Sequence, residues 1–394
     1  MKLTYKHTML ACFVGYIVQA IVNNFVPLLF LTFQKTYGIP LTAITMLITI
    51  NFGVQLLVDL ASAYFVDKIG YRISLILAHF FSAAGFLCLT ILPERLPNAY
   101  TGLLISVIVY AIGGGLLEVL VSPVVEACPT DNKEQAMSLL HSFYCWGHVG
   151  VVLISTLYFR FVGIEHWKGL TLLWMIVPLA NLAVFTQTPI ASLMEEGERG
   201  LSIGELLRNK VFWILAIMMV CSGASEQAVS QWASTLAEKG LGVTKAVGDL
   251  AGPMTFAVTM GTSRAFYGKF GDRMDLDRFM YGSCFLCVVS YLMISLLPNP
   301  ALNLLGCAVC GLSVGIMWPG SFSKSAAAIP KGGTAMFAFL ALGGDLGCSG
   351  GPTFAGMMAS HFQDNLQMGI LCSVIFPILL MGMIYLSQKM SKTK

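Results

Sequence analysis

The feature that most constrains this chain is a series of apolar runs, each about as long as a bilayer's hydrocarbon core is thick. A helix needs about 20 mostly apolar residues to cross that core, and the sequence contains about twelve such runs. The composition agrees, because 56% of the residues are hydrophobic and only 11% are charged, against roughly a quarter charged in soluble proteins. The predicted fold class is an all-α membrane protein with twelve transmembrane helices in two pseudo-symmetric bundles of six.

The runs fall into two sets separated by the longest polar stretch of the chain. The predicted spans are residues 8–33, 41–66, 73–92, 100–128, 135–162 and 169–186, then 211–237, 244–267, 279–297, 301–329, 334–360 and 366–386. The polar stretch contains Glu195, Glu196, Glu198 and Arg199. We therefore predict an N-terminal bundle at 1–187, a cytoplasmic linker at 188–210 and a C-terminal bundle at 211–394. Residues 201–208 have the period of a short amphipathic helix on the membrane surface.

A charged loop occurs once in each half of the chain, and the aligned residues of its two copies are the same number of positions apart. Residues 67–72 (DKIGYR) are echoed by residues 268–273 (GKFGDR), so that Asp67 aligns with Asp272 and Ala63 with Gly268. A shorter echo pairs residues 147–150 with 344–347. Such repeats indicate two related halves with a solute site at mid-membrane between them. The predicted conformational gate consists of Asp67, Lys68, Gly70, Arg72, Gly268, Asp272 and Arg273.

The distribution of basic residues sets the predicted orientation. With the N-terminus inside, 17 of the 23 Lys and Arg residues face the cytoplasm and 6 face outward. Cytoplasmic loops carry the excess of positive charge. We therefore expect a multi-pass protein of the cell membrane with both termini and both repeated loops in the cytoplasm.

Ionisable residues inside the spans are few, and their cost in hydrocarbon usually directs them to a bundle interior or an aqueous cavity. Glu118 lies about ten residues from the inner end of its span, or roughly 15 Å deep at 1.5 Å per residue. A carboxyl at that depth is costly to ionise, so we expect Glu118 to bind and release the coupling proton. Glu226 and Asp345 are the other coupling candidates. Arg264, Asp59 and Glu126 lie nearer the cytoplasmic edge, and we expect them in salt bridges.

Amide and aromatic side chains define the predicted solute site. Amides both donate and accept hydrogen bonds, which suits the hydroxyls of a sugar. Aromatic faces suit ring stacking but are also routine packing in such spans. The predicted substrate-binding residues are Gln19, Asn23, Asn24, Trp146, His148, Glu226, Gln227, Gln231, Trp318 and Asp345.

No metal, cofactor or nucleic acid is expected. The pairs Cys284-x-x-Cys287 and Cys307-x-x-Cys310 have spacings that imitate a four-thiolate zinc site. Both pairs lie in the middle of spans, where cysteine is better interpreted as a small apolar packing residue. His141 and His148 have no acidic pair at ligand spacing, and a hydrogen-bonding role suits them better. The net charge of +3 is too scattered for a nucleic-acid surface.

The repeated loop places a small residue, three spacers, an aspartate and a basic residue in order. This pattern resembles the loop between helices 2 and 3 of the major facilitator superfamily of secondary transporters. It departs from the family pattern at Ala63, where glycine is usual, and at Tyr71 and Asp275. Residues 140–144 and 146–147, with Trp318-Pro319 and Gly351-Pro352, are similar to the fucose-permease branch. The resemblance extends over essentially the whole chain and implies import of a sugar or similar polyhydroxylated solute, driven by protons.

The sequence therefore predicts a secondary active transporter, not an enzyme. It would move a small polar solute, with a sugar as first choice, by alternating access with proton symport, as a monomer in the bilayer. Sodium in place of the proton stays open. An exporter of amphipathic or drug-like compounds by proton antiport also stays open, although the polar rows of the seventh span disfavour it. A membrane enzyme or a transporter-like sensor is more remote, because no nucleophile arrangement accompanies His141 and Ser142.

Overall fold

The computed structural model describes residues 3–191, 200–242, 247–248, 250–363 and 365–392. All regular structure within these ranges is helical. Glu195, Glu196, Glu198 and Arg199 of the predicted linker, and Thr244 at the start of the predicted eighth span, lie outside the described residues.

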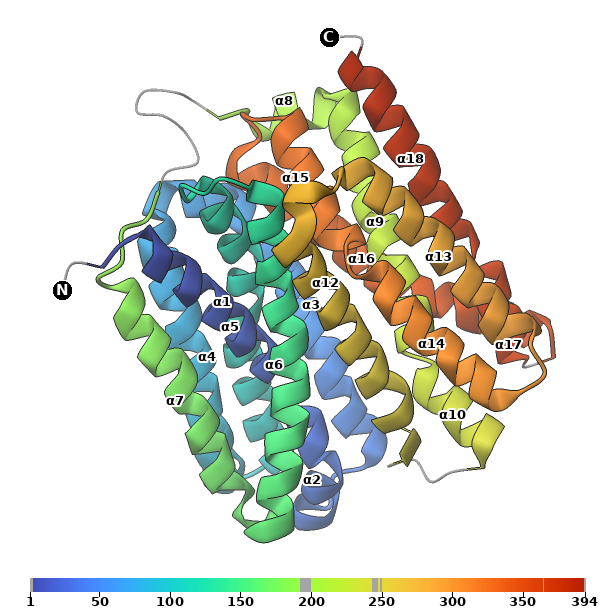
Figure 1. Cartoon of the computed structure of the whole chain (residues 1–394). Helices are drawn as coiled ribbons and strands as arrows, with labels where there is room; N and C mark the ends of the chain where they lie inside the picture. Colours follow the sequence, from blue (N-terminus) through green and yellow to red (C-terminus); the bar gives the residue numbers. More distant parts are fainter. Residues whose placement is uncertain (1–2, 192–199, 243–246, 249, 364, 393–394) are drawn as a thin grey trace. The chain divides into compact units, whose positions relative to one another are not determined.

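The first half of the chain contains seven α-helices and two short 3₁₀ turns (Figure 1). In order, these are α1 (Tyr5–Asn24), η1 (Val26–Leu29), α2 (Phe30–Tyr37), α3 (Leu41–Ile69), α4 (Tyr71–Arg95), α5 (Ala99–Ala127), α6 (Lys133–Phe161), η2 (Ile164–His166) and α7 (Trp167–Phe185).

The second half is more interrupted, and several predicted spans are divided in two. Its elements are α8 (Ile203–Arg208), α9 (Lys210–Ser230), α10 (Ala233–Leu241), the π-helical turn η3 (Leu250–Met254), α12 (Thr255–Phe270), η4 (Gly271–Arg273), α13 (Leu276–Leu296), α14 (Pro300–Val314), α15 (Met317–Ala328), α16 (Gly333–His361), α17 (Leu366–Cys372) and α18 (Ile375–Lys392). The short helix predicted at 201–208 is confirmed as α8.

Ten helical stretches among the described residues are long and apolar enough to cross a membrane. They correspond to ten of the twelve predicted spans. The other two predicted spans are the segment from η3 through α12 and the helix α16. Of these, α12 alone has 16 residues, and α16 carries Asp345 among glycines. The prediction of an all-α membrane protein is confirmed.

The described residues group into two compact units. Unit 1 consists of residues 1–129 and 146–196, and unit 2 of residues 130–145 and 197–394. The helix α6 is continuous and contributes its first half to unit 2 and its second half to unit 1. The bundles predicted from the sequence, at 1–187 and 211–394, stay a prediction. They differ from the two units because residues 130–145 fall in the predicted N-terminal bundle but in unit 2.

Within unit 1, α4 packs along both α5 and α7 (Figure 1). The approach to α5 is close because Gly113 has no side chain. A Cβ at that position would lie 2.3 Å from Ser82 Oγ and 2.5 Å from the carbonyl oxygen of Ala78. Glycine therefore sets the distance between these two helices.

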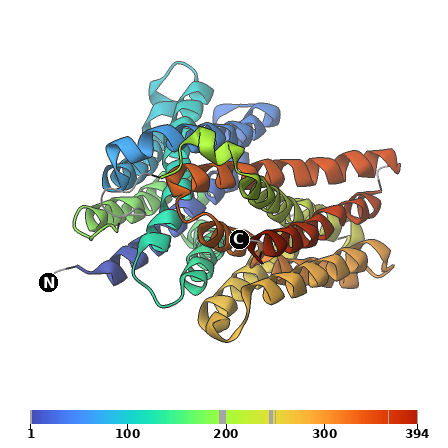
Figure 2. The same cartoon turned by 90° about the horizontal axis from the view of Figure 1, so that it is seen from above.

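Within unit 2, the glycine-rich helix α16 packs along α9. A Cβ at Gly347 would lie 2.1 Å from the carbonyl oxygen of Val220. The C-terminal helix α18, red in Figure 2, packs against both α9 and α13. Unit 2 is thus built around α9, which carries the polar rows described below.

We predict that Gly113→Ala lowers stability by about 1 to 3 kcal/mol, because backbone atoms of α4 must move to admit the methyl group. The measurement is thermal unfolding of the purified protein in detergent. The matched control is Gly53→Ala, since a Cβ at Gly53 would meet nothing within 4 Å. Equal unfolding temperatures for the two variants would contradict the close approach.

Candidate functional site

The first of the repeated loops is a sharp junction between α3 and α4. Gly70 joins the two helices with φ 86° and ψ 151°, a conformation that residues with a side chain rarely adopt. Asp67 and Lys68 are exposed in the last turn of α3. The charged side chains of Asp67 and Lys68 therefore lie on the surface, at the end of α3.

Arg72, at the start of α4, has a different environment from the exposed charges of this loop. Its Nη1 donates to the carbonyl oxygens of Phe185 at 2.8 Å and Thr186 at 3.1 Å, and its Nη2 donates to Thr188 O at 2.8 Å. Helix C-termini leave carbonyl groups without intrahelical donors. Arg72 thus caps the end of α7, a contact that the loop pattern alone did not predict.

The second repeated loop packs against the first turns of α6 within unit 2. A Cβ at Gly268 would lie 3.0 Å from Leu139 Cβ, and Gln135 Nε2 donates to Asp272 Oδ1 at 3.3 Å. Asp272 and Arg273 are exposed. The sequence identified this loop by its repeat, but it gave no sign that α6 is its partner.

In unit 1, a carboxyl and a set of amides lie on the facing sides of α1, α3 and α5. Gln19 Nε2 donates to Glu118 Oε2 at 2.7 Å. One turn further along both helices, the hydroxyls of Tyr16 and Ser122 are 2.9 Å apart. Gln19 is buried, whereas Glu118 is half-buried. The structure therefore joins two residues that the sequence assigned separately, one to the solute and one to the proton.

A second amide group extends from α1 to α3. Asn23 Oδ1 accepts hydrogen bonds from Asn51 Nδ2 at 3.1 Å and from Gln55 Nε2 at 2.8 Å. Asn24 instead donates to the carbonyl oxygen of Ala20 in its own helix. Asn51 and Gln55, both on α3, were not among the predicted site residues.

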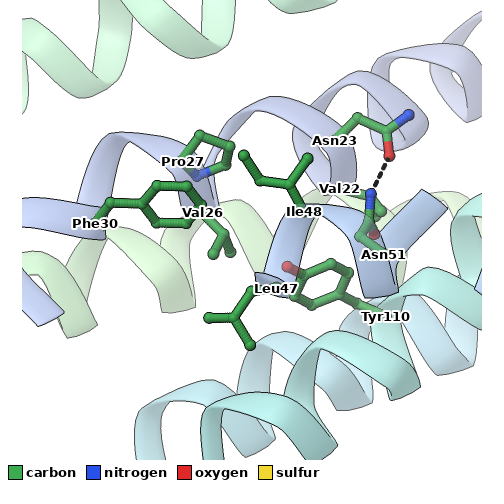
Figure 3. A pocket seen from close by; sticks show the side chains of 9 residues that line it. All are labelled: Val22, Asn23, Val26, Pro27, Phe30, Leu47, Ile48, Asn51 and Tyr110. Carbon is green, nitrogen blue, oxygen red and sulfur yellow. Dashed lines mark hydrogen bonds between the residues drawn. The ribbon is translucent and has the colours of Figure 1, made fainter. Parts of the chain in front are cut away.

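Asn23 and Asn51 also form one wall of a largely apolar pocket in unit 1 (Figure 3). The other lining residues are Val22, Val26, Pro27, Phe30, Leu47, Ile48 and Tyr110. Figure 3 shows the two asparagines bonded to each other at one end of the pocket and Phe30 toward the other end. The pocket thus combines a polar end with an apolar body.

The two predicted site residues on the second half of α6 differ in exposure. The Trp146 side chain is 40% exposed, and His148 is partly buried. Between them, Gly147 packs on α1, because a Cβ there would lie 2.9 Å from Ala20 Cβ. The two side chains therefore flank the point where α6 approaches the helix that carries Gln19 and Asn23.

In unit 2, the predicted residues of α9 form a continuous chain of hydrogen bonds. Gln231 Nε2 donates to Gln227 Oε1 at 3.0 Å, and Gln227 Nε2 donates to Glu226 Oε1 at 3.1 Å. The other carboxylate oxygen of Glu226 lies 3.1 Å from Nη2 of Arg264. The expectation that Arg264 takes part in a salt bridge is confirmed.

Arg264 holds several elements of unit 2 together at one point. Its side chain is 4% exposed, and its Nη1 lies 3.2 Å from both the carbonyl oxygen of His141 and the Sγ of Cys145. Its Nε donates to the carbonyl oxygen of Gly315 at 2.9 Å. One guanidinium thus bonds to α6, α9 and the junction between α14 and α15.

The hydrogen bond from Arg264 to the carbonyl oxygen of Gly315 is explained by the proline four residues later in the chain. In a continuous helix, the carbonyl of residue 315 would accept from the N–H of residue 319, but residue 319 is Pro319 and has none. The sequence Trp318-Pro319-Gly320 is typical of an interrupted helix. The structure has the break slightly earlier, between α14 and α15, and Pro319 lies in the first turn of α15. Arg264 supplies the donor that the proline lacks.

Trp318 is buried in unit 2. A Cβ at Gly344 would lie 2.2 Å from the Trp318 ring, and the ring centroids of Trp318 and Phe322 are 6.2 Å apart. Phe322 stacks in turn on His141 at 5.8 Å. Asp345, the residue after Gly344, is half-buried. Trp318 therefore packs against Gly344 of α16 and the ring of Phe322.

The family model of the Major Facilitator Superfamily matches residues 8–352. This chain belongs to the major facilitator superfamily. Its twelve-helix fold class is thereby confirmed, and the chain is a transporter of this superfamily.

Solved structures of the superfamily share the fold at low sequence identity. The fucose:proton symporter FucP of E. coli is 15% identical, with a TM-score of 0.80 over 97% of this chain and 99% of that chain. The proton:xylose symporter XylE is 12% identical, with a TM-score of 0.83 over 97% and 95%. A human organic anion transporter is 14% identical, with a TM-score of 0.76 over 96% and 99%. A search of the curated proteins found no matching sequence.

No cluster of three or more His, Cys, Asp or Glu side chains that could hold a metal ion occurs within the described part of this superfamily member. Cys284, Cys287, Cys307 and Cys310 are buried thiols on α13 and α14. Their location agrees with the interpretation of cysteine as a packing residue.

We predict that Arg264→Gln destabilises this transporter by about 3 to 5 kcal/mol, because the Glu226 carboxylate loses its cation in a buried setting. The double variant Arg264→Gln with Glu226→Gln should recover part of that loss, since the carboxylate charge is then removed as well. Thermal unfolding of both variants in detergent measures the difference. A double variant less stable than Arg264→Gln alone would contradict the ion-pair account.

Proposed function

We propose that this transporter imports a small polyhydroxylated solute, a sugar, together with protons. The observation that carries the proposal is the direct bond between Gln19 and Glu118 at 2.7 Å. This bond links the Gln19 amide, which suits a solute hydroxyl, with the Glu118 carboxyl, which can carry a proton. A change in protonation at Glu118 changes what Gln19 bonds to, and this couples the two ligands within one side-chain pair.

The amides of both units have the chemistry that a sugar requires. Within unit 1, Asn23, Asn51 and Gln55 offer donors and acceptors to one another. Within unit 2, Gln227 and Gln231 do the same. Hydroxyl groups are matched by such amides, because both partners donate and accept. Solved structures with this fold include a fucose:proton symporter and a proton:xylose symporter, which supports the same class of solute here.

Among the three candidate carboxyls, we assign the coupling proton first to Glu118. Glu226 is held in an ion pair by the guanidinium of Arg264 at 3.1 Å, so its carboxylate already has a structural partner. Glu118 accepts a hydrogen bond from the amide of Gln19, a neutral side chain that also suits a solute hydroxyl. Asp345, which is half-buried in α16, ranks after these two.

We propose that the two repeated loops act in the conformational cycle and not in solute binding. The contacts of Arg72 with the end of α7, and of Asp272 with Gln135 in α6, place both loops at helix ends. Helix ends are positions where one element can move relative to another. A monomer of the cell membrane with cytoplasmic termini is part of the same proposal, and it rests on the distribution of Lys and Arg.

A second candidate function is export of amphipathic compounds by proton antiport. The pocket in Figure 3 favours it, because six of its nine lining residues are aliphatic, proline or phenylalanine side chains. The polar row Glu226, Gln227 and Gln231 weighs against it. The two functions differ in the direction of proton movement relative to the solute.

We predict that Glu118→Gln abolishes solute accumulation driven by a pH gradient but preserves exchange of labelled for unlabelled solute. Glutamine keeps the shape of a protonated carboxyl and still bonds to Gln19, but it cannot release a proton. Exchange requires no net proton release, so it should persist at near the wild-type rate. Proteoliposomes loaded with solute measure both activities on one preparation.

Glu226→Gln is the matched control, since it makes the same substitution at the carboxyl that Arg264 holds. Normal accumulation by Glu118→Gln would rule out Glu118 as the coupling residue. Loss of both accumulation and exchange in a well-folded Glu118→Gln protein would move Glu118 from coupling to solute binding.

A further inference from the structure

The polar row of α9 has a fixed direction, because its buried end is a carboxylate that accepts hydrogen bonds and cannot donate them. Glu226 Oε2 pairs with Nη2 of Arg264 at 3.1 Å, and the side chains of the two residues are 13% and 4% exposed. Glu226 Oε1 accepts from Gln227 Nε2 at 3.1 Å. A glutamine amide has a donor end and an acceptor end, so this bond determines which end of Gln227 faces Glu226.

The orientation of Gln227 determines that of the next amide in the row. With its nitrogen turned to Glu226, Gln227 directs its Oε1 to Gln231, whose Nε2 donates to it at 3.0 Å. The backbone N–H of Gln231 also donates to the carbonyl oxygen of Gln227, at 3.2 Å, which keeps the two residues one helical turn apart and their side chains on the same face. Gln231 therefore has its nitrogen inside the row and its Oε1 at the end of the row.

The Oε1 atom of Gln231 accepts no hydrogen bond from the residues that the structure describes. Gln231 is exposed, although it lies within residues 210–237, a stretch long and apolar enough to cross a membrane. An amide without a hydrogen-bond partner is costly in hydrocarbon. This oxygen therefore faces an aqueous path along which a solute can reach it.

We propose that Gln231 Oε1 accepts a hydrogen bond from one hydroxyl of the transported solute, and that Glu226 and Gln227 are positioning residues that direct this oxygen, and not the amide nitrogen, toward the solute. The solute class is thus a polyol with a free hydroxyl at one defined position, where an ether or a fluorine atom is rejected. This inference rests on the proposed function and deepens it. Gln231 becomes a specificity-determining residue.

The inference is tested with monosaccharides in which one hydroxyl at a time is replaced by fluorine, which is similar in size but cannot donate a hydrogen bond. Glucose, galactose, xylose and fucose are compared with their monofluorinated derivatives, and dissociation constants are measured by calorimetry on the protein in lipid nanodiscs. In the wild-type protein, fluorine at one position should weaken binding about ten- to 100-fold, because the Gln231 acceptor loses its donor.

Two variants separate the acceptor from the residue that orients it. Gln231→Leu removes the acceptor, so the parent sugar should bind more weakly and the loss caused by fluorine should disappear. Gln227→Leu allows the Gln231 amide to turn its nitrogen outward, so the fluorinated sugar should bind about two- to tenfold more tightly than it binds the wild-type protein. Gln367→Leu makes the same substitution at a half-buried glutamine of α17 and should keep the wild-type response to fluorine.

Several results would overturn the inference. If the sugars bind but fluorine weakens binding at no position, the acceptor role is wrong and the proposed function stands. If the loss caused by fluorine persists in Gln231→Leu, another residue accepts from that hydroxyl. If Gln227→Leu responds to fluorine as Gln367→Leu does, the row does not orient Gln231. If none of the sugars binds, the proposed function fails and this inference fails with it.

Discussion

A backbone N–H or C=O group inside a bilayer has no water to bond, so each must find a partner within the protein. This constraint fixes the helical character of the chain, and it also explains the most connected side chain of unit 2. Pro319 cannot donate to the carbonyl of Gly315, and Arg264 does so instead at 2.9 Å. The charge that this brings into the interior is balanced by Glu226. A single proline thus accounts for a buried ion pair and for the meeting of three elements.

The same constraint distinguishes two of the candidate carboxyls, Glu226 and Glu118, by what holds them. Glu226 is tied to a guanidinium that is itself needed for backbone hydrogen bonding, so releasing it would disturb the junction of α14 and α15. Glu118 is bonded to the amide of Gln19, a neutral group that both donates and accepts hydrogen bonds. This difference in partners is the basis on which we propose Glu118 ahead of Glu226 as the coupling residue.

Much of the fold could be predicted from the sequence, because span length and polarity are local properties. The lengths of the apolar runs predicted ten spans that the structure has as long apolar helices. The helical period of the apolar residues in 201–208 predicted the short helix α8. Pro319 also indicates an interrupted helix, although the structure has the break a few residues before it. Proline is tolerated in the first turn of a helix, so the break precedes it. The sequence alone could not distinguish a break before the proline from one after it.

The pairing of side chains across helices could not be predicted, because it depends on how each helix is rotated and how closely it approaches its neighbours. Gln19 and Glu118 were identified separately, but their bond spans 99 positions of sequence. The partners of Arg264 at His141 and Cys145 are 123 and 119 positions away. Asn51 was not among the site residues predicted from the sequence. Its hydrogen bond with Asn23 becomes evident only when Asn23 has been placed beside it.

The central claim is that a sugar and a proton cross the membrane together in the same direction. Its most direct test uses proteoliposomes that enclose a pH-sensitive dye, with no pH gradient imposed at the start. Addition of a sugar that binds the purified protein should acidify the lumen as solute and protons enter together, and empty liposomes should show no change. Alkalinisation of the lumen on addition of the solute would show antiport and contradict the account.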